Sequence, residues 1–186
     1  MFGVLAAPAG ARASSPTAKL QAAATEMQQS PGYTFRASIR SAGSTVHIKG
    51  EYQAPDRLHQ KVRIGSGTPT EVAMIGTQVY ERGTDGAWHQ TPSSGGTATD
   101  PRTNFGVLAN ARNVSRRGQV CSFRLRPLDA QKLMGQSSSG GLRGRATLGA
   151  DGISRLEYTT RTGGRPVDVR IDYVVTSPPP TVTTPH

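Results

Sequence analysis

The sequence predicts an α+β protein of mainly antiparallel β-structure, folded as one domain. Apolar and polar residues alternate with a period of two in at least eight segments, which is typical of half-buried strands. Stripes at helical spacing occur in only two or three segments. The 22 glycines and 13 prolines among 186 residues indicate many turns, and no composition break divides the chain. We therefore expect strand residues to outnumber helix residues.

The clearest alternation runs through residues 46–64. Val46, Ile48, Gly50 and Tyr52 share one face, and charged residues share the other. The segment 58–64 repeats this pattern, and the intervening 54–56 (Ala-Pro-Asp) supplies turn chemistry, so an antiparallel hairpin is expected. A sheet that is apolar on one face must cover that face with its own helices or with a ligand. This stretch alone leaves both alternatives open.

Three helices are expected. Ser15 and Pro16 form an N-cap and a first-turn proline, followed by the stripe Leu20, Ala23, Ala24 and Met27. A second helix begins at residue 101, carries Phe105, Leu108 and Ala109, and ends near residues 112–113, and a third spans 128–134. The polar segment 91–100 before the second helix is expected to be a surface loop, either a lid or an ordinary connection.

The remaining strands are bounded by turn residues. They are expected at residues 33–40, 71–75, 78–82, around Trp88, and at 119–126, 142–148, 153–161 and 166–175. The domain is therefore expected to span residues 14–176, followed by a flexible, extended Pro- and Thr-rich tail at 177–186.

The first 13 residues resemble the end of a signal peptide. They are apolar and small, and Ala11-Arg12-Ala13 fits an A-x-A cleavage site, although the basic segment that normally precedes is missing. We expect a truncated signal peptide and an exported protein in the periplasm, the cell envelope or the medium; the alternative is a disordered Ala-rich tail. The lone Cys121 cannot form an internal disulfide and lies too deep in the chain for lipid attachment.

The net charge of +10 and the isoelectric point near 10.6 restrict the partners. The arginines are scattered, stacking aromatics are few, and no nucleic-acid-binding motif is present, so nucleic acid is not expected as a partner. A diffuse positive field fits an anionic membrane surface or phosphorylated head groups better. The alternative is that the arginines keep an exposed sheet face soluble.

No enzymatic signature is found. The sequence at 135–140 misses the G-x-S-x-G elbow by one position, and His47, His59 and His89 are not at metal-ligand spacings. We expect no catalytic residue, no metal and no cofactor.

The order of elements resembles the lipoprotein-carrier (LolA-like) superfamily, and within it the cell-surface lipoproteins of the mycobacterial type. The resemblance covers residues 17–175 and is carried by local signatures at 50–57 (Gly-Glu-Tyr-Gln-Ala-Pro-Asp-Arg), 75–76, 79–80 and 146–156. It implies a strongly curved half-barrel sheet whose concave face is covered by two or three helices, with an apolar cavity for acyl chains. Two features of the superfamily are missing: a lipidated cysteine near Ala13, and an arginine that can be matched to the lid-locking role.

The expected function is non-covalent binding of a lipid or acylated molecule by a monomeric envelope carrier or chaperone, with arginines at the cavity mouth. The alternative is an envelope sensor of the same fold that binds a protein partner, as regulators of anti-sigma factors do. Small residues such as Gly50 and Ala146 are expected to let the sheet curve and to leave volume unfilled; a filled core is the alternative. The residues expected to line the cavity are Phe35, Ile39, Ile48, Tyr52, Val62, Met74, Phe105, Leu108 and Phe123.

Overall fold

The computed structural model describes residues 14–91, 101–134 and 141–185. Within these residues the chain forms three α-helices, one 3-10 turn and eleven strands. The helices are α1 (Pro16–Gln29), α2 (Pro101–Val107) with the 3-10 turn Leu108–Asn110, and α3 (Pro127–Met134). The strands are β1 (Gly32–Ser41), β2 (Ser44–Gln53), β3 (Arg57–Ile64), β4 (Thr70–Ile75), β5 (Gln78–Arg82), β6 (Trp88–Thr91), β7 (Arg112–Arg117), β8 (Val120–Leu125), β9 (Leu142–Gly149), β10 (Gly152–Thr162) and β11 (Arg165–Val175).

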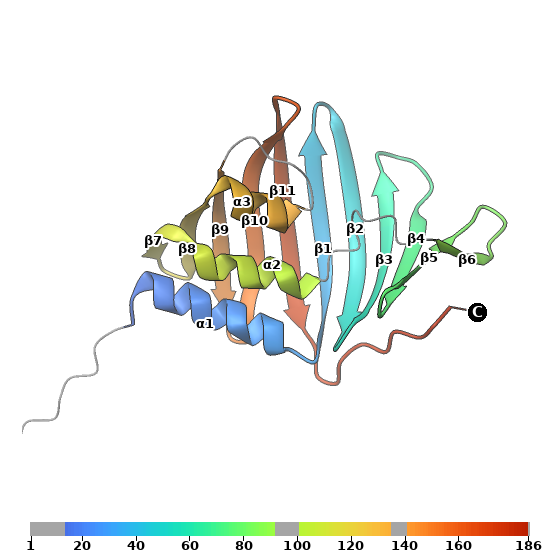
Figure 1. Ribbon diagram of the computed structural model, residues 1–186, viewed down its shortest axis with the longest axis horizontal. Helices are drawn as coiled ribbons and strands as arrows, with labels where there is room; N and C mark the ends of the chain where they lie inside the picture. Colours follow the sequence, from blue (N-terminus) through green and yellow to red (C-terminus); the bar gives the residue numbers. More distant parts are fainter. Residues whose placement is uncertain (1–13, 92–100, 135–140, 186) are drawn as a thin grey trace, which may run out of the picture.

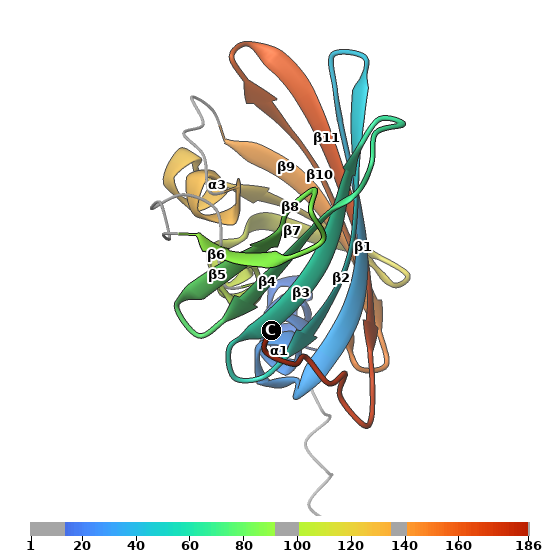
Figure 2. The same cartoon turned by 90° about the vertical axis from the view of Figure 1, so that its right-hand side faces the viewer.

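All eleven strands form one antiparallel sheet in the order β6-β5-β4-β3-β2-β1-β11-β10-β9-β8-β7. The first and last strands of the chain pair at its centre, so each half of the sheet is a meander. The sheet curves around the side on which the helices lie (Figures 1 and 2). The predicted class is confirmed: the protein is α+β and mainly antiparallel, and strand residues far outnumber helix residues.

Local sequence explains the elements that were predicted well. The Ser15 hydroxyl accepts a hydrogen bond from the Ala18 amide at 3.2 Å, so the predicted N-cap of α1 is confirmed. In the β2–β3 hairpin Ile48 lies opposite Val62. The turn at 54–56 therefore sets the expected register, which keeps the apolar residues of both strands on one face.

Strand β7 was not predicted. Helix α2 was expected to continue to residues 112–113, but it ends at Val107, and the chain is extended from Ala111 onward. A register irregularity between β7 and β8 and the single half-buried residue, Val114, remove the alternation that would have revealed the strand. Ala109, which was placed on the apolar stripe of α2, is exposed.

The hydrophobic core lies between the helices and the concave face of the sheet. The four stripe residues of α1 are all buried there, with exposures of 6% or less. They pack with Phe105 and Leu108 of the second helical segment and with residues of β8–β11. Helix α1 contacts α2, β7, β9 and β10, so the helices cover the β7–β11 part of the sheet and reach β1 (Figure 1).

The C-terminal segment was expected to be flexible and is instead packed through its described residues. Val182 is 2% exposed, its amide donates to the Gln53 side chain at 2.8 Å, and Arg57 donates to its carbonyl at 2.9 Å. The prolines 179 and 180 lie against Gly32. Proline restricts the backbone before folding, so one buried valine and two hydrogen bonds are enough to hold this extended segment against the sheet, a contact that composition alone does not reveal.

Two expectations fall on residues outside the described ranges: the signal peptide at 1–13 and most of the loop at 91–100. Among the described helices, none has the length and hydropathy needed to cross a membrane.

Candidate functional site

The two faces of the sheet differ sharply in chemistry. The face toward the helices carries apolar side chains on almost every strand, whereas the outer face carries arginine, lysine, histidine, aspartate and glutamate. This division follows from the period-two alternation, because directly paired residues point to the same side. Within the described residues, a ligand on the helix side of the sheet would therefore meet mainly apolar side chains, and a ligand on the outer side would meet mainly polar ones.

The structure divides the nine predicted cavity residues into two groups. One group belongs to the packed core or lies against it: Phe35, Tyr52, Met74, Phe105, Leu108 and Phe123. The other group, Ile39, Ile48 and Val62, shares the same face of the sheet but is only half-buried and lies outside the core cluster of the described residues. The first group therefore packs against other protein side chains, whereas the second is half-exposed.

We call the second group and its neighbours the open apolar strip: Ile39, Val46, Ile48, Val62 and Ile64. Ile39, Val46 and Ile64 form one row across β1, β2 and β3, and Ile48 and Val62 form the next row. Four of the five are half-buried, and Ile64 is 64% exposed. The strip lies on the part of the sheet that the helices leave uncovered (Figure 1). It therefore presents contiguous apolar surface.

An aromatic cluster forms part of the core where β1, β2 and β11 meet the second helical segment. Tyr33 packs against Tyr52 with ring centroids 5.0 Å apart and against Phe105 at 5.9 Å, and Phe105 packs against Tyr173 at 5.1 Å. Burial raises the pKa of Tyr158 to about 12, and burial together with the neighbouring Tyr158 raises the pKa of Tyr173. Both phenols are therefore neutral at physiological pH, and this end of the apolar face carries no phenolate charge.

The expectation that Gly50 leaves unfilled volume is wrong. Gly50 lies opposite Phe35 in the β1–β2 ladder, and a Cβ at Gly50 would overlap the Phe35 ring and come within 3.0 Å of the His59 carbonyl oxygen. Gly144 lies under Phe123 in the same way. In both pairs the aromatic ring fills the space that the absent side chain leaves.

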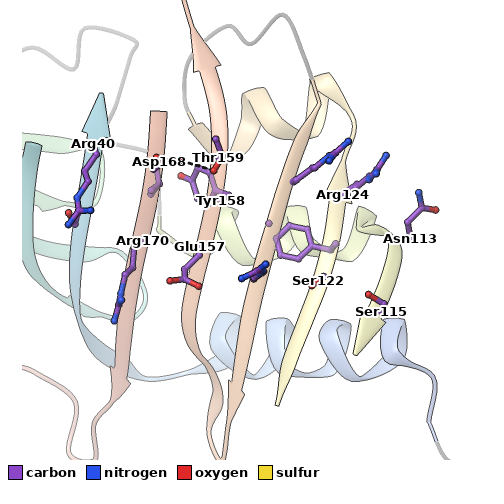
Figure 3. Close-up of a pocket in the computed structure, with 16 residues that line it drawn as sticks. Arg40, Asn113, Ser115, Ser122, Arg124, Glu157, Tyr158, Thr159, Asp168 and Arg170 are labelled. Atoms are coloured by element: carbon purple, nitrogen blue, oxygen red, sulfur yellow. Dashed lines mark hydrogen bonds between the residues drawn. The ribbon is translucent and has the colours of Figure 1, made fainter. Parts of the chain in front are cut away.

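The outer face holds a hollow of about 940 Å³ over β1 and β7–β11, and in Figure 3 the helices lie behind the sheet that carries it. The polar side chains that line it include five arginines: Arg40, Arg124, Arg143, Arg145 and Arg170. Its two acidic residues are Glu157 and Asp168. From the sequence, the arginines were expected to produce only a diffuse positive field, and this grouping was not predicted. The sequence does show that Arg124 in segment 119–126, and Arg143 and Arg145 in segment 142–148, occupy the polar positions of alternating strands. It does not show that these two strands are neighbours.

A second hollow of about 330 Å³ lies beside the C-terminal segment on the outer face of β2–β6. His59 Nδ1 is 3.3 Å from Glu51 Oε1, and its Nε2 is 3.4 Å from Glu71 Oε2. The hydrogen bond that Lys61 donates to Glu71 at 2.9 Å is the main cause that holds the pKa of Glu71 below its ordinary value of 4.5, against the opposing effect of burial. These groups already pair with one another, so we assign them a structural role.

Cys121 is fully buried in the core, and burial raises the pKa of its thiol. Within the described residues, no three His, Cys, Asp or Glu side chains are grouped so that they could hold a metal ion.

Comparison with known proteins identifies the fold. Neither a protein-family model nor a curated protein matches the sequence. Among solved structures, the lipoprotein LppX of Mycobacterium tuberculosis matches with a TM-score of 0.70 and 11% sequence identity, covering 90% of this chain and 98% of LppX. A structural match at 11% identity shows a shared fold and does not show a shared function. The chain therefore shares the fold of LppX, which confirms the fold that the sequence resemblance implied.

Proposed function

We propose that this protein is exported and binds a lipid or acylated molecule non-covalently on the open apolar strip, as a carrier or chaperone in the cell envelope. The observation that carries the proposal is that Ile39, Ile48 and Val62 lie on the core face of the sheet yet stay outside the packed core of the described residues. Large contiguous apolar surface on a soluble domain marks a place of interaction. The shared fold with a lipoprotein supports an envelope role.

An acyl chain suits the strip because it needs no polar partners. Each methylene removed from water contributes about 0.8 kcal/mol, so ten methylenes would contribute about 8 kcal/mol before the entropy lost on binding is subtracted. A tail that runs along β2 from Val46 toward Tyr52 would pass successive apolar residues at spacings of about 7 Å. The aromatic cluster would then meet its far end.

The exposed end of the strip can meet a charged head group. The turns that join β1 to β2, β3 to β4 and β10 to β11 lie near one another in the sheet order. Arg165 is exposed beside these turns, and residues 40–46, 61–70 and 161–167 contain no acidic residue. Arginine binds phosphate and carboxylate in a bidentate manner, so an anionic head group at this end would be favoured.

The test is a pair of matched substitutions. Val62→Trp places an indole on the strip, whereas Val174→Trp makes the same change on the outer face, where Val174 is 61% exposed. We expect Val62→Trp to reduce uptake of a fluorescent fatty acid at least tenfold while its melting temperature stays close to that of Val174→Trp, because half-buried Val62 lies outside the core.

Equal uptake by both variants would contradict the proposal, and so would a melting temperature of Val62→Trp far below that of Val174→Trp, since that would reveal a filled core at this position. A parent protein that takes up no acyl probe would favour the alternative role, an envelope sensor that binds a protein partner.

A further inference from the structure

Arginines of the outer hollow lie directly opposite one another on neighbouring strands, an arrangement that is not expected if they served only to keep the surface soluble. Arg124 of β8 lies directly opposite Arg143 of β9, and Arg112 of β7 lies directly opposite Arg124 on its other side. Directly opposed residues of antiparallel strands have Cβ atoms about 5 Å apart, and like charges in such pairs are destabilising. Three arginines thus form one row across three neighbouring strands.

A fourth arginine adds to this charge. Arg145 follows Arg143 by two residues on β9 and so points to the same side of the sheet. Its neighbours across the strands are Ser122 of β8 and Glu157 of β10. The exposed side chains of Arg124, Arg143 and Arg145 line the end of the hollow over β8 and β9. Figure 3 labels Arg124 among the polar residues of the hollow.

Among the described residues, the acidic ones nearby form no ion pairs with the three arginines at this end of the hollow; Glu157, although it lies opposite Arg145, is not within ion-pair distance of it. Asp168 accepts a hydrogen bond from the Thr159 hydroxyl at 2.7 Å, and Arg170 is paired with Asp172 at 3.1 Å. In the described part of the chain, no carboxylate lies within ion-pair distance of Arg124, Arg143 or Arg145. Three guanidinium groups therefore face the same space, with hydroxyl groups of Ser115, Ser122 and Thr159 around them.

We propose that this end of the hollow, formed by Arg124, Arg143 and Arg145, is a binding site for a phosphate-bearing group. A phosphate ester or diphosphate offers several anionic oxygens, and guanidinium groups bind such oxygens in a bidentate manner. One phosphate bound between the three side chains would turn like-charge repulsion into three attractive contacts. The site lies on the opposite face from the open apolar strip, so it does not depend on acyl binding. The phosphate can belong to a free molecule or to a lipid head group.

The binding test compares two variants. The triple variant Arg124→Gln, Arg143→Gln and Arg145→Gln removes the proposed site, and Arg117→Gln removes one exposed charge at the end of β7, outside the hollow. Pyrophosphate and inorganic phosphate are titrated by calorimetry at constant ionic strength. Binding to vesicles is measured by sedimentation with phosphatidylglycerol in phosphatidylcholine, and with phosphatidylcholine alone.

We expect the triple variant to lose at least tenfold in affinity for pyrophosphate or for the anionic vesicles, and Arg117→Gln to stay within about twofold of the parent, since Arg117 does not line the hollow. Saturable binding of pyrophosphate would identify a free phosphate compound as the source. Binding to anionic vesicles alone would identify a lipid head group. Equal losses in the triple variant and in Arg117→Gln would overturn the proposal, as would a parent protein that binds neither probe.

The melting temperature tests the proposed phosphate site independently of the binding measurements. Because the three arginines repel one another in the free protein, the triple variant should melt at the same temperature as the parent or higher in low salt, and pyrophosphate should raise the melting temperature of the parent alone. A triple variant that melts well below the parent, with no response of the parent to pyrophosphate, would contradict the arrangement. Uptake of a fatty acid should be unchanged in the triple variant, which separates this site from the apolar strip.

Discussion

The close contact between Gly144 and Phe123 allows a stability change to be worked out from the structure. A Cβ on Gly144 would lie 2.9 Å from Phe123 Cε2 and 3.0 Å from Cε1, and closer still to Cζ. Phe123 is 3% exposed, so its ring cannot swing into solvent. Overpacking costs about 1 to 3 kcal/mol. Replacing glycine with alanine also stabilises the folded state by about 0.4 to 1 kcal/mol, because the unfolded chain has less conformational entropy.

We therefore expect Gly144→Ala to lower the free energy of unfolding by about 1.5 kcal/mol. For a domain of this size, that corresponds to a fall in melting temperature of about 3 to 6 °C. Calorimetry and urea denaturation would measure both quantities. Gly149→Ala on the same strand is the matched control, because its Cβ would meet Ser154 Cβ at 3.3 Å near the exposed strand end, and we expect a change within about 0.5 kcal/mol.

The loss of stability in Gly144→Ala should arise from overlap with the Phe123 ring. In a cycle with Phe123→Leu, the smaller side chain should relieve the clash, so Gly144→Ala should cost less in the leucine background than in the parent. Contacting residues typically show a coupling of about 0.5 to 3 kcal/mol. Additive effects, or an alanine variant as stable as the Gly149→Ala control, would refute the claim that the ring occupies the space above Gly144.

Two further predictions concern titratable groups. Cys121 is fully buried and its thiol pKa is raised by burial, so it should resist a thiol reagent in the folded protein and react at once in urea; rapid labelling under native conditions would contradict the buried position. The pKa of Glu71 is lowered, chiefly by the hydrogen bond from Lys61, so its contribution to stability is present above the ordinary value of 4.5 and is lost as pH falls through the lowered pKa. The difference in urea midpoint between the parent and Glu71→Gln should therefore shrink on acidification, and a difference that does not vary with pH would disprove this linkage.

Most strands and all three helices could be predicted because their signals are local. The N-cap at Ser15 and the turn at 54–56 act within a few residues of the chain. Strand β7 gave no such signal, because only Val114 of its six residues is half-buried. The C-terminal segment also escaped prediction, since the side chain of Gln53 that holds Val182 lies 129 residues away in sequence.

The candidate sites depended on information that alternation does not contain. Apolar periodicity placed all nine cavity residues on apolar faces of strands or helices, but it could not say that Phe105 and Leu108 of the second helical segment pack into the core with Phe123. It also could not say that Ile48 and Val62 stay outside that core. The arginine row needs the pairing of β8 with β9, and α3 together with the following segment separates these strands in the sequence. Strand order is a tertiary property, so no local pattern around Arg124 indicates that Arg143 lies beside it.

The two proposed sites lie on opposite faces of one sheet and on different strands, which makes their chemistries opposite and their functions separable. Ile39 and Arg40 are adjacent in β1, yet one belongs to the open apolar strip and the other lines the hollow behind it. Residues of opposite orientation share backbone but not side-chain surroundings. A change of side chain on one face should therefore alter one ligand and spare the other, whereas a change that bends the strand should alter both. Loss of fatty acid and phosphate binding together in a side-chain variant would thus indicate a distorted sheet, and loss of one alone is the pattern that two independent sites require.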